Sequence, residues 1–138
     1  MFNTILVALD NPTLSERVMQ ALNNLQLDSS TVIFTHVIST NETGEQQPAD
    51  RPSADPQRGL FRHIEEELQA YQASLPCASK LEIVSGDPPE EIVRLANIYE
   101  ADLILIGSRG LTGVTRILQG SVSSQVVSEA HCSVLVVR

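Results

Sequence analysis

The chain has 138 residues, of which 42% are hydrophobic and 19% charged, and its formal net charge is −8. This size and composition predict one globular domain, and the acidic balance argues against nucleic-acid binding and against attachment to anionic lipid. No apolar run approaches the roughly 20 residues that span a bilayer, and the N-terminus lacks the pattern of a signal peptide, so we expect a cytoplasmic protein. The two cysteines, Cys77 and Cys132, are far apart and are expected to be reduced, half-buried thiols.

The first half of the chain predicts two strands and two helices. Apolar residues in short runs indicate buried strands, and apolar residues three or four apart indicate helices. A segment rich in Pro, Asp, Gln and Gly interrupts them, and it predicts a flexible, irregular loop over residues 39–58. The expected elements are, in chain order, a strand over 2–9, a helix over 15–25, a strand over 31–38 and a helix over 60–75.

The second half of the chain continues the alternation and contains the clearest helix signal. Asp87 is the expected N-cap, Pro88 occupies the first helical position, and Glu90 stands three residues after the cap, as in a capping box. The expected elements are, in order, a strand over 79–86, the helix that follows Asp87, a strand over 102–107, a helix over 120–130 and a strand over 132–138.

Strands that alternate with helices predict an α/β fold: a single-domain, open, five-stranded parallel sheet with helices on both faces and right-handed crossovers. Ligands of such sheets bind outside the carboxyl ends of the strands, where the strand order reverses. Asp10, Val37 and Gly107 all stand at or near predicted carboxyl ends, and we therefore expect them to meet.

A glycine-rich segment, "GSRGLTGVTRILQGS", runs from Gly107 to Ser121 between a predicted strand and a predicted helix. Residues 103–128 contain no Asp or Glu, although the whole chain is acidic. A helix start offers unpaired backbone N–H groups and partial positive charge, which attract phosphate. The segment therefore predicts a phosphate-binding loop.

Within this segment the glycines have separate expected uses. Gly107 and Gly110 let the backbone approach a ligand closely, and Gly120 does so at the helix entry, where a serine hydroxyl follows. Arg109 adds positive charge. The competing interpretation is a flexible loop whose glycines serve only its turns. The segment is neither a Walker A loop nor a G-x-G-x-x-G dinucleotide fingerprint.

The segment has the pattern G-x-x-G, followed after nine residues by G-S. This pattern resembles the signature of the ATP-binding subgroup of the universal stress protein family. The stretches "ILVALD", "FTHVI", "GDPPEEIVRLA", "ADLILIGSRG" and "SVLVV" also stand where that family has counterparts, so the resemblance covers almost all of the chain except 39–58. It implies a Rossmann-like sheet of the adenine nucleotide alpha hydrolase-like type. It also implies a stress-response protein that binds ATP or AMP and signals by a change of conformation or partner.

The resemblance further implies a role for each matching residue. One group contacts adenosine: Asp10 matches an acid on the adenosine part, and Val37 matches a residue whose backbone reads the adenine. Ala8 stands in the same stretch, where many relatives have proline, which changes the shape of the adenine pocket. The residues implied for the ribose and phosphates are Gly107, Arg109, Gly110, Gly120, Ser121 and Val122.

The family also implies a divalent cation, Mg²⁺ or Mn²⁺, bound with the triphosphate, and a homodimer that forms through the last strand, from Val134 to Arg138. An apolar strand at the edge of a sheet invites such pairing on physical grounds as well.

An enzyme on the same fold is the alternative to the binding protein, whereas a phospho-receiver domain is not supported by the residues. An adenylating or pyrophosphatase enzyme on the same fold would need glycines after the first strand, where this chain reads "ALDNPTLS", so we expect at most a weak ATPase. A phospho-receiver domain would need a lysine after the fifth strand, where the chain has only Arg138. His36 is expected to be a hydrogen-bonded histidine of the core or its rim rather than a catalytic group, and the histidines show no metal-ligand spacing.

Overall fold

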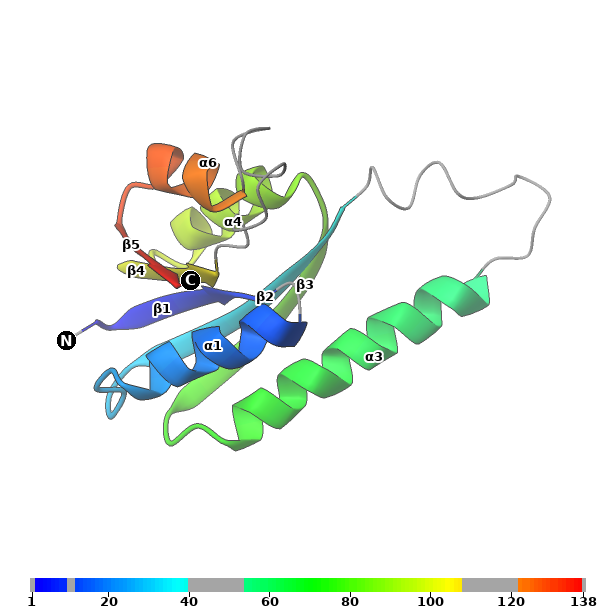
Figure 1. The fold of residues 1–138 in the computed structure, drawn as a ribbon, viewed down its shortest axis with the longest axis horizontal. Coiled ribbons are helices and arrows are strands. Elements are labelled where there is room, and N and C mark those ends of the chain that lie inside the picture. Colours follow the sequence, from blue (N-terminus) through cyan, green and yellow to red (C-terminus); the bar gives the residue numbers. More distant parts are fainter. Residues whose placement is uncertain (1, 10–11, 40–53, 108–121, 138) are drawn as a thin grey trace.

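The computed structural model describes residues 2–9, 12–39, 54–107 and 122–137. They form five strands and four helices around one parallel sheet, whose strand order is β3-β2-β1-β4-β5 (Figure 1). The predicted fold class is therefore confirmed. In chain order the elements are β1 (Thr4–Ala8), α1 (Pro12–Asn23), β2 (Thr31–Ser39), α3 (Ala54–Ala73), β3 (Ala78–Gly86), α4 (Pro88–Ile98), β4 (Leu103–Gly107), α6 (Val122–Glu129) and β5 (Ser133–Val137).

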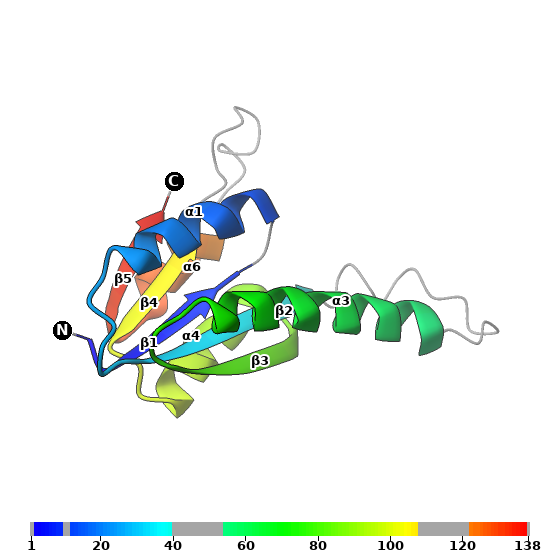
Figure 2. The same cartoon turned by 90° about the horizontal axis from the view of Figure 1, so that it is seen from below.

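The sheet is covered on both faces, which the figures show from two directions: α1 and α3 lie on one face, and α4 and α6 lie on the other (Figures 1 and 2). Successive residues of a strand point to opposite faces. In β1, Ile5 and Val7 therefore join the core under α1 and α3, whereas Leu6 and Ala8 join the core under α4 and α6. The central strand is consequently apolar over its four buried positions, Ile5 to Ala8.

Burial on both faces explains why the apolar runs of β1 and β4 form strands. Leu103 to Ile106 of β4 are at most 4% exposed, and Ile5, Leu6 and Val7 of β1 are 0% exposed. Each such side chain contributes about 1.5–3 kcal/mol when it is fully removed from water. Among the described residues, no helix is both long enough and apolar enough to cross a bilayer.

The N-terminus of α4 confirms the sequence-based cap. Asp87 has extended backbone angles, and its Oδ2 accepts a hydrogen bond from the backbone N–H of Glu90 at 3.4 Å. Pro88 is the first helical residue, where its missing N–H has no intrahelical partner to lose. Glu90 and Glu91 in the first turn also suit the positive end of the helix dipole.

Several predicted boundaries were wrong. The irregular segment predicted over 39–58 is wrong at both ends, because β2 extends to Ser39 and α3 begins at Ala54; residues 40–53 lie outside the described part. The α3 boundary was missed because Pro56 and Gly59 suggest a loop, although proline is tolerated in the first turn of a helix. For the same reason α1 begins at Pro12, before the predicted start at residue 15.

Candidate functional site

The order of the strands identifies one edge of the sheet as the expected place for a ligand. From the central β1, β2 and β3 extend to one side, and β4 and β5 extend to the other. The strand order therefore reverses between β1 and β4, and a crevice forms at such a switch point outside the carboxyl ends. Ala8, the last residue of β1, is in register with Ile106, so Gly107 lies one residue beyond this pair.

Four of the nine predicted binding residues are described, and all four lie toward this edge. Ala8 and Gly107 end β1 and β4, Val37 lies two residues before the end of β2, and Val122 begins α6. Ala8 belongs to the hydrophobic cluster under α4 and α6, and Val37 and Val122 pack against the same cluster. The structure thus brings these three side chains to one face of the sheet. The other predicted residues, Asp10, Arg109, Gly110, Gly120 and Ser121, lie outside the described residues.

The backbone at the end of β1 is fixed by two contacts with β2. The N–H of Leu9 donates to the carbonyl oxygen of Thr35 at 2.9 Å, and the carbonyl oxygen of Leu9 lies 2.9 Å from Nδ1 of His36. The half-buried His36 therefore has a hydrogen-bond partner, as predicted for a histidine at the rim of the core. Both contacts act on the residue that directly precedes Asp10.

Thr35 is a polar residue of this edge that the sequence analysis missed. Its side chain is 0% exposed, and Oγ1 has no hydrogen-bond partner among the described residues. In the sequence it is a lone hydroxyl within the apolar run "VIFTHVI". A single polar residue in an apolar run is a signal that could have pointed to Thr35, but only the structure shows that its hydroxyl has no partner among the described residues.

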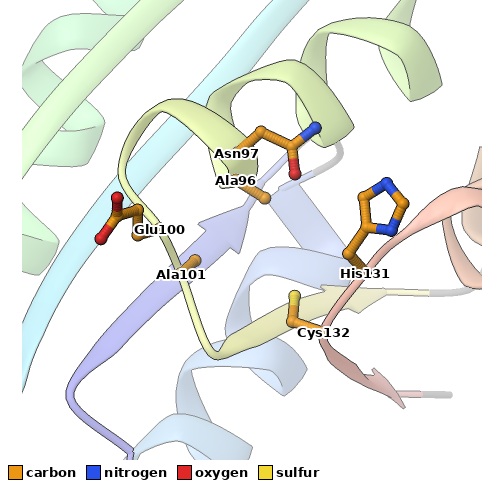
Figure 3. A pocket seen from close by; sticks show the side chains of 6 residues that line it. All are labelled: Ala96, Asn97, Glu100, Ala101, His131 and Cys132. Carbon is orange, nitrogen blue, oxygen red and sulfur yellow. The ribbon is translucent and has the colours of Figure 1, made fainter.

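A separate pocket lies at the opposite edge of the sheet, at the amino ends of β4 and β5 (Figure 3). It has a volume of about 280 Å³ and is lined by Ala96, Asn97, Glu100, Ala101, His131 and Cys132. Burial, and secondarily the charge of Asp102, raises the pKa of the Cys132 thiol, which keeps it protonated and weakly nucleophilic at neutral pH. The pocket contains none of the predicted binding residues.

The two cysteines are half-buried, as the sequence predicts. Cys77 and Cys132 are free and half-buried, and burial also raises the pKa of Cys77. In that part of the chain, no group of three or more His, Cys, Asp or Glu side chains is arranged to hold a metal ion.

Comparison with known proteins gives a family match over the whole chain. The model of the universal stress protein family matches residues 1–138. Universal stress protein Sll1388 of Synechocystis is 30% identical over 154 residues, which cover 99% of this chain and 98% of that protein. A shorter match, to universal stress protein MJ0531 of Methanocaldococcus jannaschii, is 51% identical over 57 residues and covers 41% of this chain and 34% of that protein.

Solved structures share the same fold. The structure of MJ0577 from Methanocaldococcus jannaschii is 28% identical with a TM-score of 0.84 and covers 99% of this chain and 96% of that chain. A universal stress protein solved in complex with cAMP has a TM-score of 0.72 at 20% identity and covers 99% of this chain and 97% of that chain. One from Archaeoglobus fulgidus, solved in complex with dAMP, has a TM-score of 0.64 at 21% identity and covers 99% of this chain and 98% of that chain.

Proposed function

This chain belongs to the universal stress protein family, and we propose that it binds an adenine nucleotide, ATP or AMP, at the carboxyl-terminal edge of its sheet. The observation that carries the proposal is the reversal of strand order between β1 and β4, beside which the glycine-rich segment begins at Gly107. Structures of two proteins of similar fold hold cAMP and dAMP, which supports an adenine nucleotide as the ligand class.

The adenosine part is proposed to lie over the ends of β1 and β2. Val37 offers its backbone to the adenine, and Asp10 offers a carboxylate to the ribose or base. Ala8 contributes only a methyl group beside them, so this pocket is wider than one closed by proline. The two contacts from Leu9 to β2 support this assignment, because they fix the backbone from which Asp10 continues.

The phosphates are proposed to bind the segment that leads into α6. Gly107, Gly110 and Gly120 allow close approach of backbone N–H groups, and Ser121 and Arg109 add a hydroxyl and a positive charge. The start of α6 at Val122 contributes the positive end of its helix dipole. The absence of carboxylates over residues 103–128 avoids repulsion of the phosphates. Mg²⁺ or Mn²⁺ would be held mainly through the triphosphate and would neutralise part of its charge.

The proposed activity is binding and signalling in a stress response, with at most weak ATP hydrolysis. Nucleotide binding would favour the conformations that bind the ligand better, and a signalling partner would distinguish them from the ligand-free state. The described part of the site offers no nucleophile with an adjacent general base, since His36 is already engaged with a backbone carbonyl. The alternative, an ATP-hydrolysing or adenylating enzyme, predicts fast turnover of ATP.

A homodimer through β5, from Val134 to Arg138, is the second part of the proposal. β5 is an edge strand that pairs with β4, and it leaves Leu135 39% and Val136 37% exposed. An uncovered apolar edge favours pairing with a second copy.

Replacement of Gly120 by valine tests the assignment of the phosphate segment. Gly120→Val should weaken ATP binding by about tenfold or more, because one lost close contact with a charged phosphate is worth roughly 1.5–3 kcal/mol. Gly59→Val is the matched control: Gly59 is exposed in α3, and an added β-carbon there meets nothing within 4 Å. Calorimetric titration with ATP, ADP and AMP, together with an ATP turnover assay, measures the effect.

The outcomes separate the alternatives. Loss of binding in Gly120→Val with normal binding in Gly59→Val supports the assignment, whereas equal affinities in both variants contradict it. Failure of the wild-type protein to bind any of the three nucleotides at millimolar concentration contradicts nucleotide binding itself. Fast hydrolysis of ATP favours the enzyme.

A further inference from the structure

Thr35 is a buried polar residue of β2. Its side chain is fully buried, and Oγ1 lacks a hydrogen-bond partner among the described residues. Buried side-chain polar atoms are hydrogen-bonded in the large majority of cases, so each exception needs an explanation. Valine has nearly the same shape without the hydroxyl, and packing alone therefore does not explain a threonine here.

The position of Thr35 relates it to the proposed nucleotide site. Alternate residues of a strand share a face, and its neighbours at alternate positions, Ile33 and Val37, both contact the cluster under α4 and α6. Thr35 therefore lies on that face, two residues before Val37, the residue proposed to read the adenine. It is in register with Ala8 on one side and with Glu82 on the other.

The residue of β1 that is in register with Thr35 is small and lies at the carboxyl-terminal edge of the sheet. Ala8 carries a single methyl group, and it is the last residue of β1. The carbonyl oxygen of Thr35 accepts the final inter-strand hydrogen bond, from the N–H of Leu9. Thr35 thus occupies the last paired position between β1 and β2, beneath the place where adenosine is proposed to bind.

We propose that Thr35 is a binding residue of the nucleotide site, whose hydroxyl forms a hydrogen bond with the adenosine part of the ligand, directly or through one water molecule beneath it. This inference rests on the proposed function and adds a residue to it. The base and the ribose both carry donors and acceptors that a hydroxyl can match. The phosphates, proposed to lie at the start of α6, are not its partners.

The test compares Thr35→Val, which removes the hydroxyl, with Thr35→Ser, which keeps it. Thr31→Val is the matched control, because it makes the same substitution at the amino end of the same strand. Calorimetry with ATP and AMP measures affinity, and urea denaturation measures the stability of the ligand-free protein. We expect Thr35→Val to bind both nucleotides about fivefold to tenfold more weakly, as for one lost hydrogen bond. Thr35→Ser and Thr31→Val should stay within about twofold of wild type.

The stability measurement distinguishes a ligand contact from a structural one. If the hydroxyl has no hydrogen-bond partner until a ligand binds, the ligand-free Thr35→Val protein should be as stable as wild type or more stable. A Thr35→Val protein that is clearly destabilised or fails to fold would show that the hydroxyl has its partner within the protein, and it would overturn the inference. Unchanged nucleotide affinity, or a loss for ATP but not for AMP, would overturn it as well. If the wild-type protein binds nucleotide and Thr35→Val binds it equally well, only this inference is contradicted. If the wild-type protein does not bind nucleotide, the proposed function is contradicted as well.

Discussion

Nδ1 of His36 lies 2.9 Å from the carbonyl oxygen of Leu9, so a side chain of β2 holds the backbone at the point where β1 ends. His36→Phe removes this hydrogen bond and should lower the free energy of unfolding by about 1 kcal/mol. Nucleotide affinity should fall with it, because Asp10 follows Leu9 directly. His36→Asn keeps an N–H donor near the position of Nδ1, so its stability and its nucleotide affinity should both fall less. Urea denaturation and ATP titration measure the two effects, and equal behaviour of the two variants would contradict this role.

Asp102 connects the starts of β4 and β1, and it gives the stability of the protein a predicted dependence on pH. Its carboxylate oxygens accept hydrogen bonds from the backbone N–H groups of Asn3 and Thr4, both at 2.9 Å. Burial opposes ionisation of this carboxyl, but the backbone N–H donors outweigh burial and hold its pKa below the ordinary value. Asp102→Ala should therefore cost about 1 kcal/mol at pH 7, allowing for its partial exposure to solvent.

The sign of the pH dependence follows from the lowered pKa. The ionised carboxylate stabilises the fold above the unfolded-state pKa of about 3.9, and this contribution is lost as the pH falls through the folded-state pKa. The stability difference between wild type and Asp102→Ala should accordingly shrink below about pH 4. Asp28→Ala, at an exposed position, serves as the control. A difference that stays constant down to pH 2 would contradict this account of Asp102.

Glu100 directly follows Tyr99, the C-cap of α4, and has a backbone conformation that favours glycine. Its φ is 53°, and the N–H groups of Glu100 and Ala101 donate to the carbonyl oxygens of Asn97 and Ala96 at 3.2 and 2.9 Å, the hydrogen-bond pattern of a Schellman motif. Glu100→Gly should raise the free energy of unfolding by roughly 0.5–1 kcal/mol, because glycine adopts this conformation without strain. The same change at Gln125, exposed within α6, should lower it by about 1 kcal/mol. Denaturation of both variants checks the contrast, which a destabilised Glu100→Gly would refute.

The sequence predicted the features that depend on local pattern. The all-apolar run of β4 and the cap formed by Asp87 before Pro88 are examples, because burial on both faces and capping act over a few neighbouring residues. The early start of α3 was missed, since proline and glycine favour loops on average and only the surrounding fold decides an individual case.

Contacts between distant residues were not predictable from one sequence. The contact of His36 with Leu9 spans 27 residues, and that of Asp102 with Asn3 spans 99. No local pattern marks either one, and the unpaired hydroxyl of Thr35 likewise follows from tertiary packing. The site residues were proposed from the glycine spacing and the family resemblance. The structure describes four of these residues, and they lie toward one edge of the sheet.

The exposed edge of β5 predicts how dimerisation can be disrupted. Replacing Leu135 and Val136 with lysine places charges along this edge, which should prevent pairing with a second copy while the fold is retained. Sedimentation velocity should then show a dimer for wild type and a monomer for the double variant. Ile98→Lys, at a position of α4 that is 58% exposed, should remain dimeric. A wild-type monomer, or a double variant that still dimerises, would show that β5 is not the interface.

Amide chemical-shift mapping during a titration with AMP tests nucleotide binding and its location together. The predicted result is saturable shifts at Ala8, Val37, Gly107 and Val122, with no comparable shifts at Ala101 and Cys132 at the opposite edge of the sheet. An absence of shifts at millimolar AMP, or shifts confined to the pocket at the amino ends of β4 and β5, would contradict a nucleotide site at the carboxyl-terminal edge.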